Sequence, residues 1–171
     1  MDHLNEQLKT LRLGHAAQAL DQQREQLSTY AELSFEERLG LLLECELLNR
    51  DQTKIQRLKR QAKLRLNAQA SQLIYKEGRG LMRAKMSELL TGSYLHKHQN
   101  ILITGPTGAG KTYVACAIAE QACERQYTVR YYRLSRLLDD LSSGKLDGSY
   151  QKQLLALSKK ALLIIDDRGW K

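Results

Sequence analysis

The chain has 171 residues, of which 42% are hydrophobic, and its formal net charge is +8. This length allows one ordinary domain with an appended helical region, and the hydrophobic fraction is typical of a folded protein rather than a disordered one. No apolar run approaches the roughly 20 residues of a membrane span, and the N-terminus has no signal-peptide core. The composition therefore favours a cytoplasmic protein without a membrane partner.

The first half of the chain is predicted to be helical. Residues 1–95 contain no proline and are rich in Leu, Gln, Glu, Arg and Ala, which favour helix. Leucines at helical spacing predict a first helix over about residues 3–27. Ser34 followed by Glu37 is the pattern of a capping box, so a second helix is expected to begin there. That helix is expected to continue to about Asn67.

Basic side chains gather in one stretch of this region. Between residues 50 and 85 there are eleven Lys or Arg and two acidic residues, a net charge of +9. An apolar stripe at helical spacing, formed by Ile55, Leu58, Ala62 and Leu66, leaves most of the remaining helix surface to the bases. A solvated helix face usually mixes charges of both signs, so this surface favours sequence-independent contact with double-stranded DNA over a merely solubilising role. The residues assigned to DNA contact are Arg50, Lys54, Arg57, Lys59, Arg60, Lys63 and Arg65.

In the second half, expected strands alternate with expected helices. A turn over residues 76–80 and a short helix over 81–90 come first. The expected strands are 101–104, 128–132 and 161–166, and the expected helices are 111–125, 135–141 and 151–158, with a loop over 144–148. Such alternation predicts an α/β fold with a parallel sheet and helices on its faces. The predicted division is a helical region over residues 1–95 and a nucleotide-binding region over residues 96–171.

Residues 105–112 match the phosphate-binding pattern GxxxxGK[ST], the Walker A motif, in full. Phosphate oxygens need several converging backbone N–H groups, and glycines permit both the turn and the close approach. The match follows an apolar segment and precedes a helix, whose N-terminal end adds positive charge. We predict that Lys111 reaches the β- and γ-phosphates of ATP and acts in catalysis, and that Thr112 binds Mg²⁺. The residues assigned to ATP are Gly105, Pro106, Thr107, Gly108, Ala109, Gly110, Lys111 and Thr112.

A second motif ends the last expected strand. The apolar residues 162–165 lead into Asp166 and Asp167, which is the pattern of a Walker B strand. We predict that Asp166 holds the Mg²⁺, directly or through water, and that Asp167 orients or deprotonates the attacking water as a catalytic residue. The pattern alone is weak, and its position downstream of the glycine loop makes it specific.

These motifs occur in the same order in a known family. They are residues 33–39, the basic helix, and residues 79–81, 100–108, 111–112, 129–132 and 163–167. The chain resembles the IstB-like ATP-binding proteins, AAA+ helper subunits of insertion-sequence transposition that are related to DnaC-type helicase loaders. The resemblance implies an ATPase that assembles as a homo-oligomer on DNA and works with a partner transposase. A replicative helicase loader, or a DNA-binding or interaction module with a vestigial nucleotide site, remains the alternative.

The resemblance also implies sequence beyond Lys171. Family members continue with the fourth and fifth strands of the sheet, a polar sensor residue and an arginine finger. The fourth strand lies between the strand before the glycine loop and the strand that ends at Asp166, so we expect a partial P-loop NTPase sheet with its central position empty. On this basis the chain is expected to be an incomplete copy, a fragment or an interrupted reading frame, that folds poorly alone and hydrolyses ATP slowly.

Overall fold

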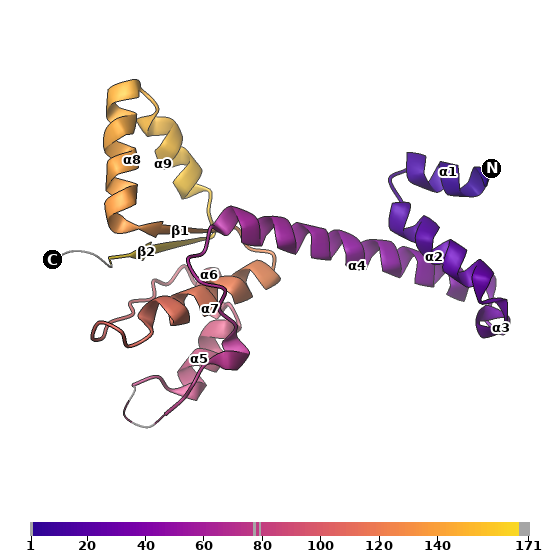
Figure 1. Ribbon diagram of the computed structural model, residues 1–171, viewed down its shortest axis with the longest axis horizontal. Helices are drawn as coiled ribbons and strands as arrows, with labels where there is room; N and C mark the ends of the chain where they lie inside the picture. The colour runs from indigo at the N-terminus through magenta and orange to yellow at the C-terminus, as the bar shows by residue number, and fades with distance from the viewer. Residues whose placement is uncertain (1, 77, 79, 168–171) are drawn as a thin grey trace. The chain divides into compact units, whose positions relative to one another are not determined.

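The structure is a computed structural model that describes residues 2–76, 78 and 80–167 (Figure 1). The chain divides into two compact units, Met1–Lys54 and Ile55–Lys171, and helix α4, Phe35–Ala62, contributes residues to both. None of the helices in the described ranges is long and apolar enough to cross a membrane. The functional boundary predicted near residue 95 is a different division and stays a prediction.

The first unit contains α1 (His3–Thr10), α2 (Gly14–Glu25), α3 (Leu27–Tyr30) and the first part of α4. The single helix predicted over residues 3–27 is therefore wrong in its continuity. Arg12 has a φ of 60° in the left-handed region. Its N–H donates to the Lys9 carbonyl at 2.9 Å, and the Leu13 N–H donates to the Leu8 carbonyl at 2.8 Å. These two bonds form a Schellman motif, which ends α1 without the glycine that usually marks such a turn.

The predicted start of α4 is confirmed, whereas its predicted end is wrong. The Ser34 hydroxyl accepts from the Glu37 N–H at 3.2 Å, and the Ser34 N–H donates to the Glu37 carboxylate at 2.7 Å. These bonds form the expected capping box and lower the pKa of Glu37. α4 ends at Ala62 rather than near Asn67, because Lys63 takes a left-handed φ of 51°. Leu66 consequently lies outside the helix and is 38% exposed, while the rest of the predicted stripe is buried.

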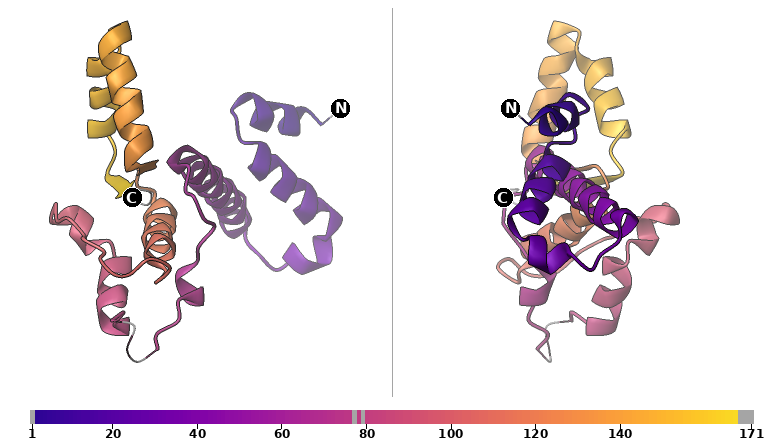
Figure 2. Two further views of the ribbon diagram at one scale, coloured as in Figure 1. Left: turned by 60° about the vertical axis from the view of Figure 1, so that its left-hand side comes forward. Right: turned by 90° about the vertical axis from the view of Figure 1, so that its right-hand side faces the viewer.

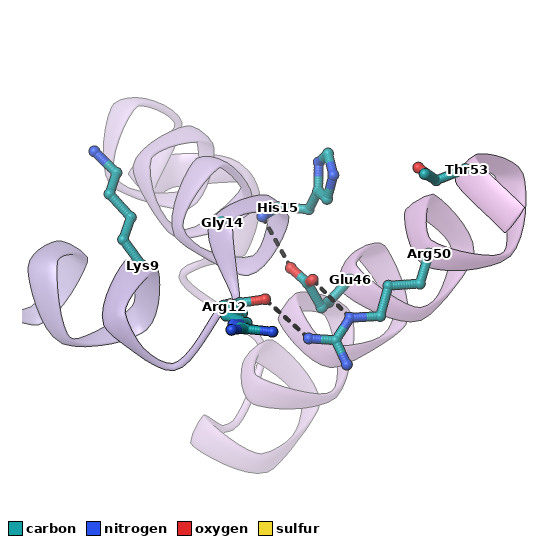
Figure 3. A pocket seen from close by; sticks show the side chains of 7 residues that line it. All are labelled: Lys9, Arg12, Gly14, His15, Glu46, Arg50 and Thr53. Carbon is teal, nitrogen blue, oxygen red and sulfur yellow. Dashed lines mark hydrogen bonds and ion pairs between the residues drawn. The ribbon is translucent and has the colours of Figure 1, made fainter. Parts of the chain in front are cut away.

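Glu46 on α4 caps the N-terminal end of α2 with its carboxylate. One carboxylate oxygen accepts from the backbone N–H groups of His15 at 2.9 Å and Ala16 at 3.0 Å. The other accepts from Arg50, whose guanidinium also donates to the Arg12 carbonyl (Figure 3). Burial of Glu46 works to raise its pKa, but the bonds from Ala16, Arg50 and His15 outweigh it and hold the pKa below its usual value.

We expect Glu46→Ala to lower the free energy of unfolding by about 2 kcal/mol, because two N–H groups at the start of α2 lose their acceptor. In the wild type this stabilisation is present above the unfolded-state pKa of 4.5 and is lost as the pH falls through the lower folded-state pKa. Urea denaturation at neutral and acidic pH measures both effects. Glu44→Ala, on the exposed side of the same helix, is the matched control. Equal losses in the two variants would contradict this role for Glu46.

The core of the second unit forms around α7, Lys111–Glu124. Small buried side chains on this helix allow close packing against the end of α4 and the first strand. One cluster consists of Leu58, Ala62, Ala119, Ala122, Cys123 and Val129. A salt bridge from Lys59 to Glu120, at 2.7 Å, joins α4 to α7 beside this cluster. The helix predicted over residues 111–125 is confirmed.

The sheet consists of two parallel strands, β1 (Val129–Arg133) and β2 (Leu162–Asp166). The segment of chain that connects β1 to β2 forms α8 (Leu134–Asp147) and α9 (Tyr150–Ser158), which lie side by side as an antiparallel pair (Figures 1 and 2). The loop predicted over residues 144–148 is wrong for most of its length, because α8 continues to Asp147. Gly144 lies inside the helix, close to α9, and a Cβ there would lie 2.7 Å from the Gln153 side-chain oxygen, so the Gln153 side chain would have to move.

The strand predicted over residues 101–104 does not form. A strand needs a hydrogen-bonded neighbour, and in the described part of the chain β1 and β2 pair with each other and not with this segment. Ile101 and Ile103 pack against the cluster of Met86 and Ile118, whereas Leu102 is 88% exposed. The predicted α/β class is confirmed, as a partial P-loop NTPase fold with a short parallel sheet.

Shorter elements connect α4 to the glycine loop. They are the 3₁₀ turn η1 (Ala70–Gln72), α5 (Arg83–Leu90) and α6 (Ser93–His96). α5 confirms the helix predicted over residues 81–90; it ends at Leu90, and Gly92, two residues later, has a left-handed φ of 79°. In the turn predicted over residues 76–80, Gly78 and Gly80 have positive φ, and Glu77 and Arg79 lie outside the described residues. These elements pack Met86 and Tyr94 against Ile118 of α7.

Candidate nucleotide-binding site

The glycine loop leads directly into α7. Gly105, Gly108 and Gly110 have φ values of 152°, 82° and 91°, which residues with a side chain adopt only with strain. The Gly110 carbonyl accepts from the Val114 N–H at 3.0 Å and so begins the helix. The N-terminal end of α7, where backbone N–H groups point outward and carry partial positive charge, therefore lies at the loop.

The Lys111 side chain folds back over this loop. Its ammonium donates to the carbonyls of Gly105 at 2.7 Å and Pro106 at 2.9 Å. Both acceptors are neutral, and a phosphate oxygen is a stronger partner for an ammonium group. The Lys111 ammonium is therefore held at the loop, where an anionic ligand can replace the two carbonyls as its hydrogen-bond partner.

The two residues predicted to hold a metal lie in contact. The Thr112 hydroxyl, which is 4% exposed, donates to one carboxylate oxygen of Asp166 at 2.7 Å. Thr112 opens α7 and Asp166 ends β2, so the packing of α7 on this strand brings the two together. Hydroxyl and carboxylate oxygens are ligands suited to Mg²⁺, which commonly uses one or two protein oxygens together with phosphates. The donor set fits ATP with Mg²⁺.

Tyr131 on β1 joins the site and was not predicted. Its hydroxyl donates to the same Asp166 oxygen at 2.7 Å. Burial and the neighbouring Asp166 carboxylate raise the pKa of Tyr131 to about 12, so the phenol keeps its proton. The period-2 pattern of the strand could have indicated that Tyr131 faces the same side as buried Val129. Sequence spacing alone could not indicate its distance from Asp166.

Asp167 is exposed and lies beyond the end of β2. The structure therefore places it next to Asp166 in the chain but outside the hydrogen-bonded group formed by Thr112, Tyr131 and Asp166. Its predicted action on a water molecule stays a prediction.

The seven bases predicted to contact DNA differ in their surroundings. Arg50 forms a salt bridge with buried Glu46 at 3.0 Å. Lys59 forms salt bridges with Glu120 and Glu124, which raise its pKa against the effect of burial. Arg65 interacts electrostatically with the Tyr131 hydroxyl and opposes the rise of its pKa. The remaining exposed bases are Lys54, Arg57, Arg60 and Lys63.

Sequence comparisons show the family to which the chain belongs. The family model of the IstB-like ATP binding protein matches residues 6–171. An insertion sequence IS1162 protein of Pseudomonas fluorescens, named for ATP binding, is 43% identical over 98% of this chain and 72% of its own length. An insertion-sequence protein of Sinorhizobium fredii, also named for ATP binding, is 40% identical over 81% of this chain and 56% of its own length. The chain belongs to the family of IstB-like ATP-binding proteins of insertion sequences.

Proposed function

We propose that this chain binds ATP with Mg²⁺ and acts as a DNA-contacting helper of a transposase in the movement of an insertion sequence. The observation that carries the nucleotide part is the contact of Thr112 with Asp166 at the start of α7, a helix whose first residue, Lys111, holds its ammonium on the glycine loop. A hydroxyl, a carboxylate and a cation at a glycine-rich helix start are the groups that bind a magnesium nucleotide.

Each residue has a distinct role in this proposal. Backbone N–H groups of residues 105–112 bind the phosphates, and the Lys111 ammonium moves from the two loop carbonyls to the β- and γ-phosphates. Thr112 and Asp166 hold the Mg²⁺, which neutralises charge on the phosphates when bound. Asp167, exposed at the end of β2, is the residue that orients an attacking water.

DNA contact is assigned to the exposed bases at the end of α4, and these bases bind phosphates without reading sequence. A partner transposase and a homo-oligomer are part of the same proposal, which is supported by relatives named for insertion sequences. Residues 1–95 would then serve assembly and DNA contact, and residues 96–171 would bind the nucleotide. The proposed cellular location is the cytoplasm, where the protein would meet DNA.

Calorimetric titration of the chain with ATP tests the nucleotide part. We expect saturable binding with one site in the presence of Mg²⁺, and affinity about tenfold lower when EDTA removes the metal, because Thr112 and Asp166 then lose their bridge to the phosphates. Absence of saturable binding at millimolar ATP with Mg²⁺ would contradict the proposal.

A further inference from the structure

The pairing of the two strands explains how Tyr131 reaches Asp166. Tyr131 of β1 lies opposite Ile164 of β2 in the parallel register. Side chains alternate along a strand, so Ile164 and Asp166 face the same side of the sheet. Asp166 is therefore the diagonal neighbour of Tyr131, at a distance that an aromatic side chain can span.

Packing fixes the ring of Tyr131 in this position. The side chain is 6% exposed and lies in a cluster with Ala68, Cys116 and Ala117. Ala68 follows α4, and the other two residues lie on α7, so the ring is held between these segments and the strand. A buried ring of this kind has little freedom to rotate, and its hydroxyl has a fixed direction.

The hydroxyl of Tyr131 belongs to a small network of polar contacts. It donates to Asp166, and the Arg65 guanidinium interacts electrostatically with it. The Asp166 oxygen that it contacts also accepts from the Thr112 hydroxyl, and both distances are 2.7 Å. A carboxylate held by two donors on one oxygen has a fixed plane, and residues that orient a metal ligand in this way tune metal binding without touching the metal.

We propose that Tyr131 is a positioning residue that holds the Asp166 carboxylate in the orientation that binds the Mg²⁺ of bound MgATP. This inference rests on the proposed function of the site. Arg65, which was predicted to contact DNA, acts here through Tyr131.

The test compares dissociation constants of a fluorescent ATP analogue with Mg²⁺ and with EDTA. For Tyr131→Phe we expect affinity in Mg²⁺ to fall about tenfold and affinity in EDTA to stay within about twofold, because only the metal-dependent part needs an oriented Asp166. The matched control is Tyr132→Phe, the next residue on β1, whose ring lies against the Arg130 guanidinium. It should leave both constants unchanged.

Arg65→Ala provides a second variant that leaves the Tyr131 ring in place. It should reduce the Mg²⁺-dependent gain in the same direction but by only about two- to threefold, since the cation that interacts with the Tyr131 hydroxyl is removed one step from the carboxylate. Thermal melting checks that each variant is folded.

Three outcomes are distinguishable. If Tyr131→Phe keeps the wild-type gain from Mg²⁺, the positioning role is wrong while the proposed function stands. If Tyr131→Phe weakens ATP equally with and without the metal, the residue is structural and the inference also fails. If the wild type itself gains nothing from Mg²⁺, the proposed metal site is wrong and this inference fails with it.

Discussion

Replacing Lys111 by Ala is expected to weaken the binding of MgATP by about 100-fold. The Lys111 ammonium already lies over the loop, 2.7 and 2.9 Å from two carbonyls. On nucleotide binding it exchanges these neutral partners for phosphate oxygens, and charge-assisted hydrogen bonds contribute about 1.5–3 kcal/mol each. A loss of about 3 kcal/mol corresponds to slightly more than 100-fold in the dissociation constant. Calorimetric titration with ATP and Mg²⁺ measures it.

The matched control for this variant is Lys97→Ala, an exposed lysine that follows α6 in the same unit. It removes the same charge and should leave the dissociation constant unchanged, so a loss in both variants would indicate a general effect of charge. A Lys111→Ala dissociation constant within twofold of the wild type would favour the alternative in which the loop is vestigial.

Local signals predicted most of the helices and strands correctly. The capping box at Ser34 and Glu37 forms as expected, because both partners lie within one turn and need no distant contact. The glycine at position 110 and the apolar residues 162–165 likewise mark the starts of α7 and β2. Signals of this kind depend on neighbours in sequence, which is the information that a single sequence contains.

The errors arise where the residue types in the local sequence do not decide the structure. The end of α1 depends on a left-handed Arg12, and the end of α4 on a left-handed Lys63, although neither residue type favours that conformation. Gly144 favours a loop when only its sequence neighbours are considered. In the structure it lies inside α8, where Gln153 of α9 is close to the position that a Cβ would take. Residues 101–104 have the composition of a strand but pair with no strand among the described residues.

The site was predicted in part. Thr112 and Asp166 were expected to share a metal, and the structure brings them together at 2.7 Å. Tyr131 was missed because the strand register that places it beside Asp166 cannot be derived from composition. The basic stretch was predicted to form one surface, whereas Arg50 forms a salt bridge with Glu46 one turn earlier on α4, and Lys59 forms one with Glu120, far away in sequence.

Because Arg50 and Lys59 are paired with acidic residues, the test of DNA contact uses the other exposed bases near the end of α4. Arg57 and Arg60 are exposed on α4, and Lys63 is exposed immediately after it. Each phosphate that such a base neutralises contributes about 0.9 to the slope of log affinity against log salt. Reversing all three charges, as Arg57→Glu, Arg60→Glu and Lys63→Glu together, is therefore expected to reduce this slope by about 2.7 and the affinity at 0.1 M salt by two to three orders of magnitude.

Fluorescence anisotropy with a labelled DNA duplex, repeated at several salt concentrations, measures both quantities. The matched control reverses three exposed lysines of the α8–α9 pair, Lys145, Lys152 and Lys159, so that the net charge changes by the same amount. If the bases at the end of α4 form the contact surface, the control keeps the wild-type slope and loses little affinity. If both triple variants lose the same affinity, attraction by the net charge alone explains DNA binding and the assignment to α4 is wrong, because a contact surface requires bases at particular positions.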